Sequence, residues 1–164
     1  MKTKKEPKGS ARKTISLKTE KIVNAYRILT TPNTPYSKGL VVTSLDPQDM
    51  YRVIRAVHAL RPVATAVSAF VDDAKARLRP EGWSEIEEKI DRFDSLEPEV
   101  QTRVNKIRRS YEDQLSECVA PELEKEQEVN AYEHLDEKAF ITIVKANGHL
   151  LDVPSIMLLE EIIA

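Results

Sequence analysis

The chain has 164 residues, of which 41% are hydrophobic and 32% charged, enough for one packed domain with a densely charged surface. Four glycines and 5% aromatic residues are too few for the repeated turns of an all-β sandwich or barrel. No run approaches the roughly 18 consecutive apolar residues of a membrane helix, and the basic N-terminus lacks the apolar run of a signal peptide. We therefore expect a cytoplasmic protein without membrane contact.

The net charge of −2 conceals an uneven distribution. Residues 1–21 carry eight basic side chains against two acidic ones, whereas residues 81–99 carry eight acidic side chains against two basic ones. This separation suits self-association or a charged partner, and solvated helix surfaces produce the same pattern. A single cysteine, Cys118, excludes an intramolecular disulfide and a cysteine-cluster metal site.

Residues 1–15 are expected to form a flexible basic arm, because prolines, glycine and lysines leave almost nothing to bury. Its basic side chains are candidate contacts for nucleic acid or an acidic partner: Lys2, Lys4, Lys5, Lys8, Arg12 and Lys13. Residues 16–29 then predict a first helix, which the prolines after it end. A β-branched run at residues 40–43 predicts a short strand.

The longest predicted element is a helix over residues 46–79, with Asp46 as N-cap and Pro47 in its first turn. Apolar residues recur seven apart along it: Met50, Val57, Ala64, Val71 and Leu78. Such a helix spans roughly 50 Å if straight, so another long element has to cover it. Pro62 removes one backbone hydrogen bond and either kinks the helix or divides it into two.

A second helical arm is predicted over residues 84–119. Ser84 and Glu87 match a capping box after the turn at residues 80–82. Residues 94–98 interrupt the apolar stripe, with Pro98 suited to the first turn of a resumed helix. Trp83 is expected to pack over the hairpin turn. Because a tight turn joins the two arms, residues 46–119 predict an antiparallel helical hairpin.

Residues 129–164 predict a strand followed by two short helices. The strand, at residues 129–132, is expected to pair with residues 40–43 in a small two-stranded sheet. Residues 135–146 resemble residues 45–56, and both patterns predict an Asp-capped helix. Asn147 and Gly148 predict a left-handed end to the first of the short helices. The last helix, residues 155–163, places Ile156, Leu159 and Ile163 on one face, for core packing first and for docking a partner second.

Together these elements predict a mainly α protein, a single helical domain at residues 16–164 behind the basic arm. Motifs of catalysis and cofactor binding are missing: the sequence has no phosphate-cradling glycine loop, nucleophile elbow or dinucleotide fingerprint. His58, His134 and His149 share no metal-ligand spacing. We therefore expect no catalytic residue, no metal and no cofactor.

The acidic segment offers one alternative to this expectation. Glu85, Glu88 and Asp91 are spaced like the magnesium ligands of helical nucleotide pyrophosphohydrolases. Those enzymes also need a second carboxylate pair on a facing helix, for which Asp72 and Asp73 are the nearby candidates. We interpret the segment as a solvated helix face, with a magnesium-dependent nucleotide hydrolase as the alternative.

The strand-to-capped-helix pattern and the closing segment VPSIMLLEE, residues 153–161, resemble uncharacterised small helical accessory proteins of bacterial phages and prophages. The resemblance implies a structural or assembly role, and a virion-associated location as an alternative to the cytoplasm, and it transfers no functional residue. The sequence thus favours a non-catalytic interaction or assembly protein with a protein partner or a homo-oligomeric state. A nucleic-acid adaptor is the alternative, using the basic arm and the basic residues of two helices: Arg52, Arg55, Arg103, Lys106, Arg108 and Arg109.

Overall fold

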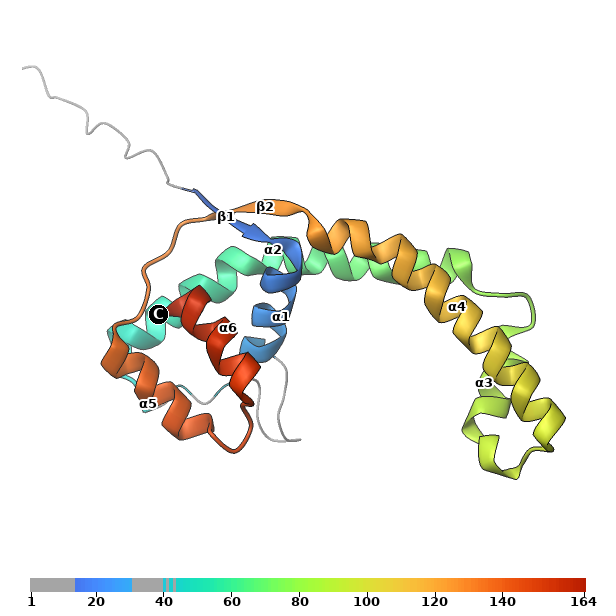
Figure 1. Cartoon of the computed structure of the whole chain (residues 1–164). Helices are drawn as coiled ribbons and strands as arrows, with labels where there is room; N and C mark the ends of the chain where they lie inside the picture. Colours follow the sequence, from blue (N-terminus) through green and yellow to red (C-terminus); the bar gives the residue numbers. More distant parts are fainter. Residues whose placement is uncertain (1–13, 31–39, 41, 43) are drawn as a thin grey trace, which may run out of the picture.

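The computed structural model describes residues 14–30, 40, 42 and 44–164. This part of the chain is mainly helical and forms a head from which a long helical arm projects (Figure 1). The elements are β1 (Thr14–Lys18), α1 (Thr19–Thr30), α2 (Pro47–Leu78), α3 (Trp83–Asp91), the 3-10 turn η1 (Phe93–Ser95), α4 (Pro98–Glu124), β2 (Glu126–Asn130), α5 (Glu137–Asn147) and α6 (Val153–Ile163). The predicted mainly α fold with a long helical hairpin and a two-stranded sheet is confirmed.

Helix α2 belongs to both the head and the arm. Asp46 caps it, accepting hydrogen bonds from the backbone N–H groups of Gln48 and Asp49 at 2.9 and 3.0 Å. These bonds satisfy two amides of the first turn that have no partner within the helix. Pro62 lies inside the helix on an exposed position, and the helix continues past it to Leu78. The division of residues 46–79 into two helices is therefore wrong.

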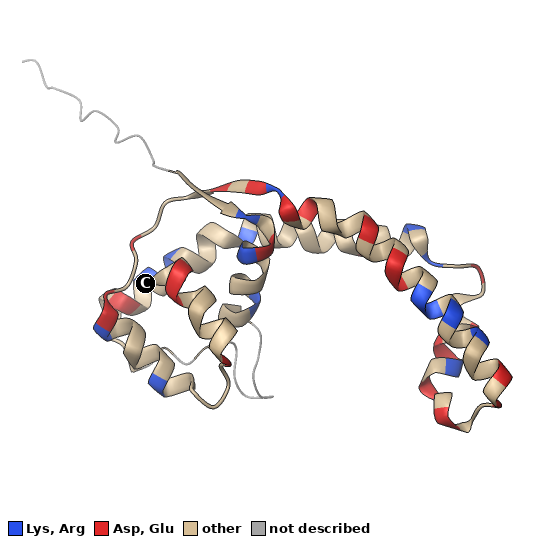
Figure 2. Cartoon of the chain, in the orientation of Figure 1, with Lys and Arg blue, Asp and Glu red and all other residues tan. Residues whose placement is uncertain are grey.

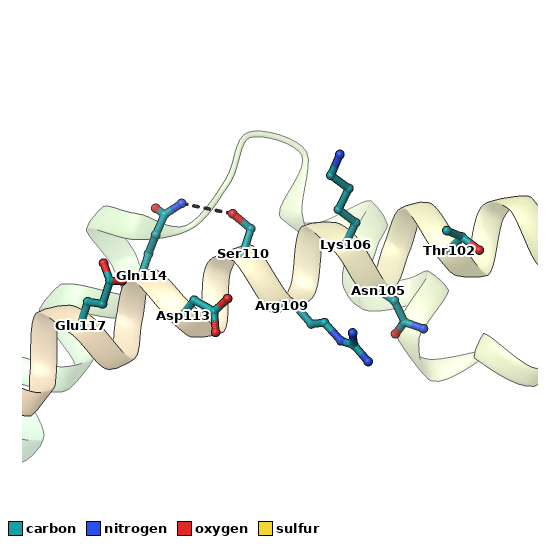
Figure 3. Close-up of a pocket in the computed structure, with 8 residues that line it drawn as sticks. All are labelled: Thr102, Asn105, Lys106, Arg109, Ser110, Asp113, Gln114 and Glu117. Carbon is teal, nitrogen blue, oxygen red and sulfur yellow. Dashed lines mark hydrogen bonds between the residues drawn. The ribbon is translucent and has the colours of Figure 1, made fainter.

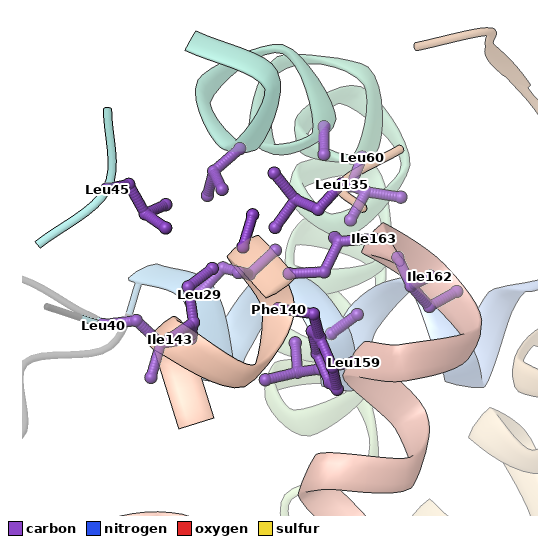
Figure 4. Close-up of a cluster of buried hydrophobic side chains, with 14 of the residues drawn as sticks. Leu29, Leu40, Leu45, Leu60, Leu135, Phe140, Ile143, Leu159, Ile162 and Ile163 are labelled. Atoms are coloured by element: carbon purple, nitrogen blue, oxygen red, sulfur yellow. The ribbon is translucent and has the colours of Figure 1, made fainter. Parts of the chain in front are cut away.

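The core lies in the head, where α1, the first half of α2, α5 and α6 meet (Figure 4). One fully buried side chain from each of these helices stands at its centre: Ile22, Leu60, Ile143 and Leu159. Leu159 and Ile163 are 0% and 1% exposed, as the core-packing interpretation expected, and Ile156 packs half-buried against the same cluster. Leu159 and Ile163 therefore offer no surface for docking a partner.

The sheet joins different segments from those predicted. β1 pairs with β2 in antiparallel register, with Thr14 opposite Asn130 and Lys18 opposite Glu126. Of the predicted strand at residues 40–43, positions 41 and 43 lie outside the described residues, and Leu40 and Val42 belong to no strand. The expected partner of β2 was therefore wrong.

The same finding corrects the N-terminal part of the chain, where a flexible arm was expected to residue 15 and a helix from residue 16. In β1 the side chains alternate, with Ile15 and Leu17 packed against the core and their neighbours exposed. This period of two is typical of a strand with one buried face. The first helix therefore begins only at Thr19.

The start of α3, the end of α4 and the backbone conformation after α5 also differ from the prediction. Gly82, with a φ of 71°, precedes α3, and Ser84 lies inside that helix and caps nothing, so the capping box is wrong. Helix α4 continues past Pro121 to Glu124, and in this last turn Leu123 is half-buried and Glu124 pairs with Lys18 of β1. Helix α5 ends at Asn147 as predicted, but Gly148 has a φ of −59° and is right-handed.

Among the described helices, α2 is long and apolar enough, by length and composition alone, to cross a membrane. The core helix of a soluble protein passes the same test, and 33% of the apolar window of α2 is buried inside the structure. The prediction of a cytoplasmic protein without membrane contact stays a prediction.

The cap of α2 predicts a pH-dependent stability. The backbone hydrogen bonds from Asp49 and then Gln48 lower the pKa of Asp46 below its ordinary 3.8. A depressed folded pKa contributes stability above the unfolded pKa of about 4, and the contribution is lost as pH falls through the folded value. We expect Asp46→Ala to lower the urea midpoint at pH 7 and to have a smaller effect at about pH 2.5.

Asp46→Asn is the matched control for this prediction, since it keeps a side-chain acceptor without the charge. It should destabilise less than Asp46→Ala at pH 7. A deficit of Asp46→Ala that stays the same at both pH values would contradict the assigned role of the carboxylate.

Candidate interaction surface on the arm

The arm is fixed to the head where α4 ends and β2 begins. Thr19, which is fully buried, donates both its backbone N–H and its Oγ1 hydroxyl to the carbonyl of Lys125, each at 2.8 Å. Beside it, Lys18 Nζ lies 2.8 Å from a carboxylate oxygen of Glu124. This pairing raises the pKa of Lys18 and lowers that of Glu124. The base of α4 is thereby held, and the rest of the helix extends away from the head.

Further along the arm, α3 folds back on α4 through an aromatic contact. The rings of Trp83 and Tyr111 have centroids 4.5 Å apart and planes inclined at 48°, a tilted arrangement that aromatic pairs favour. Trp83 Nε1 donates to Glu87 at 2.7 Å, and the Tyr111 hydroxyl donates to the carbonyl of Lys75 at 3.3 Å. Trp83 is therefore buried beside the hairpin turn, as predicted, and the Trp83–Tyr111 pair links α3 to α4 and, through the Tyr111 hydroxyl, to α2.

One side of α4 forms a polar surface along the arm, which we name the α4 face (Figure 3). Its residues line an open hollow of about 590 Å³: Thr102, Asn105, Lys106, Arg109, Ser110, Asp113, Gln114 and Glu117. They recur every three or four positions, the spacing that places helical residues on one face. Gln114 Nε2 donates to Ser110 Oγ at 3.3 Å within this face.

The charges of the α4 face are separated along the helix. Helix α4 runs from the far end of the arm toward the head (Figure 1), so Lys106 and Arg109 lie farther from the head than Asp113 and Glu117. Within the described part of the chain, none of these four side chains takes part in an ion pair. The face therefore presents two unpaired positive and two unpaired negative charges to solvent.

The basic residues that were predicted to contact a partner lie in separate parts of the chain. The six candidates of the N-terminal arm lie outside the described residues: Lys2, Lys4, Lys5, Lys8, Arg12 and Lys13. On α4, Arg108 lies 3.5 Å from Glu112, while Lys106 and Arg109 belong to the α4 face. Arg52 and Arg55 lie on the head portion of α2, so the two basic groups do not form one surface.

The acidic residues considered for magnesium binding do not converge. Glu85, Glu88 and Asp91 are exposed along α3, which packs against α4. Asp72 and Asp73 of α2 instead lie 4.0 Å from Lys75 and Arg77, respectively. Within the ranges that the structure describes, no group of three histidine, cysteine or acidic side chains is placed to hold a metal ion.

A second hollow, of about 500 Å³, lies on the head between α2 and residues 131–133. This hollow was not predicted from the sequence, because the segment from Tyr51 to Arg55 and the residues around Tyr132 that line it lie far apart along the chain. Arg52 is held there by Asp49 at 2.7 Å and Glu133 at 3.2 Å. Burial raises the pKa of Tyr132 to about 12, and its hydroxyl donates to Ile162 at 3.0 Å.

The two surfaces differ in the charges they leave available. In the head hollow, Arg52 has two carboxylate partners, and the hydrogen bonds to Glu133 and then Asp49 raise its pKa. On the α4 face, four charged side chains have no ion-pair partner among the described residues. The α4 face is therefore the stronger candidate for binding a charged surface.

Comparison with protein-family models, with curated proteins and with solved structures found no match to this chain. The resemblance to phage accessory proteins accordingly stays a hypothesis. The functional conclusion rests on the geometry and charge of the described residues.

The packing of the arm predicts a large loss of stability for one substitution and almost none for a substitution at the neighbouring residue. Trp83→Ala removes the ring contact with Tyr111 and the bond to Glu87, and we expect it to cost about 3–5 kcal/mol of unfolding free energy. Ser84→Ala should change it by less than about 0.5 kcal/mol, because Ser84 is exposed inside α3. Urea unfolding followed by far-UV circular dichroism measures both.

The Ser84→Ala variant also distinguishes the observed start of α3 from the capping box predicted at Ser84. A true N-cap at Ser84 would make Ser84→Ala cost about 1 kcal/mol. That result, or a Trp83→Ala variant as stable as the wild type, would contradict the described packing.

Proposed function

We propose that this chain is a non-catalytic interaction or assembly protein whose arm presents the α4 face to a protein partner. The observation that carries the proposal is a row of four charged side chains, without an ion-pair partner among the described residues, on a helix that projects from the head. Charged side chains in such a row steer and orient a complementary surface more than they stabilise the fold that carries them.

The packing of the arm supports this proposal, because the arm contributes little to the core. Helix α4 has 27 residues and buries only Val104 and Tyr111, whereas the 11 residues of α6 bury Leu159, Ile162 and Ile163. Along the arm, α2 and α4 pack against each other, and α3 covers them only near the far end. So long an extension adds little to the core of the head, which supports a role in presenting a surface.

The surface charges favour a protein partner over nucleic acid. On the α4 face the basic pair Lys106 and Arg109 is followed by Asp113 and Glu117, which repel phosphate groups. The alternative of a nucleic-acid adaptor uses the basic N-terminal arm, of which residues 2–13 lie outside the described residues, together with basic residues of α2 and α4 that do not form one surface. We therefore propose that the α4 face binds a protein rather than nucleic acid.

Site-specific photo-crosslinking in the cells that make the protein tests this proposal. A photoreactive amino acid at Ser110, in the middle of the α4 face, should give crosslinked protein, and native mass spectrometry should find the chain in a complex. The same amino acid at Glu137, an exposed residue of the head, is the control and should crosslink less. A mass of 18.6 kDa together with no crosslink from Ser110 would overturn the proposed function.

A further inference from the structure

The order of charges on the α4 face is self-complementary when the helix is reversed. Along the chain two basic residues, Lys106 and Arg109, precede two acidic ones, Asp113 and Glu117. We propose that two copies of this chain associate through their α4 faces in antiparallel orientation. Lys106 of one copy then faces Glu117 of the other, and Arg109 faces Asp113. The inference rests on the proposed function and names its partner as a second copy.

The spacing of the charges allows one two-fold axis to satisfy both kinds of pair. The midpoint between Lys106 and Glu117 and the midpoint between Arg109 and Asp113 both fall at the level of Tyr111, within one residue along the helix. A two-fold axis there repeats each pair, because each copy contributes the same residues to the interface. A parallel pair of helices would instead set like charges opposite each other.

The shape of the protein permits this arrangement. The arm projects from one side of the head, so two arms that run antiparallel place their heads at opposite ends (Figure 2). Between the charges this face carries Ser110 and Gln114, both polar, and the short side chain of Ser110 lets two helices approach closely there. The face carries equal numbers of positive and negative side chains, so two copies meet without net repulsion there.

Charge reversal provides the test, measured by sedimentation equilibrium at low salt. The wild type should have the mass of two chains. A variant with Lys106→Glu and Arg109→Glu and another with Asp113→Lys and Glu117→Lys should each raise the dissociation constant about 100-fold or more, since like charges then face each other. An equimolar mixture of the two variants should recover the two-chain mass, because every facing pair is again opposite in sign.

The matched control carries Glu85→Lys and Glu88→Lys on α3, which change the net charge as the acidic reversal does. These residues are exposed and lie off the α4 face, so the control should associate like the wild type. Circular dichroism spectra verify that every variant is folded.

Two outcomes overturn the inference. One is a wild type with the mass of a single chain at every concentration, and the other is a mixture of the reversed variants that stays monomeric while the wild type pairs. If a monomeric wild type still gives crosslinks from Ser110 to a different protein, self-association fails and the proposed function stands.

Discussion

The whole architecture depends on α2 remaining one helix across Pro62. Its first half places Val53, Ala56 and Leu60 in the core of the head, and its second half is one of the two helices of the arm. Because a helix is stiff over this length, the direction in which the head packs also fixes the direction of the arm. Pro62 occupies an exposed position between the two halves, where the ring meets solvent rather than the core.

Contacts at both ends of the arm hold α4 and α3 against α2 and the head. Thr19 ties the base of α4 to the head through Lys125, and Trp83 and Tyr111 hold the three arm helices together. Between these anchors the α4 face carries four charged side chains that form no ion pair within the described ranges. An extended surface with ordered charges, held at both ends, suits recognition of another protein surface, and in the proposed antiparallel pair that surface is a second copy.

Local signals made part of this fold predictable from the sequence. Asp46, Pro47 and the seven-residue apolar spacing lie within one segment, so the long helix followed from them directly. The strand β1 did not, because Ile15 and Leu17 also fit a helical stripe and their partner β2 lies more than a hundred residues away. Likewise Ser84 matched a cap, but the left-handed backbone of Gly82 decided where α3 begins. The sequence singled out the basic residues of α4. That Asp113 and Glu117 lie on the same face as Lys106 and Arg109 became clear only from the structure.

A distance measurement along α2 tests the central claim most directly. Spin labels at Gln48 and Ala76, both exposed, in a Cys118→Ser background would report the separation of the two halves by pulsed electron paramagnetic resonance. One uninterrupted helix predicts a narrow distance distribution centred at about 40 Å. A broad distribution, or one centred at a clearly shorter distance, would show that the helix breaks at Pro62 and that the head does not direct the arm.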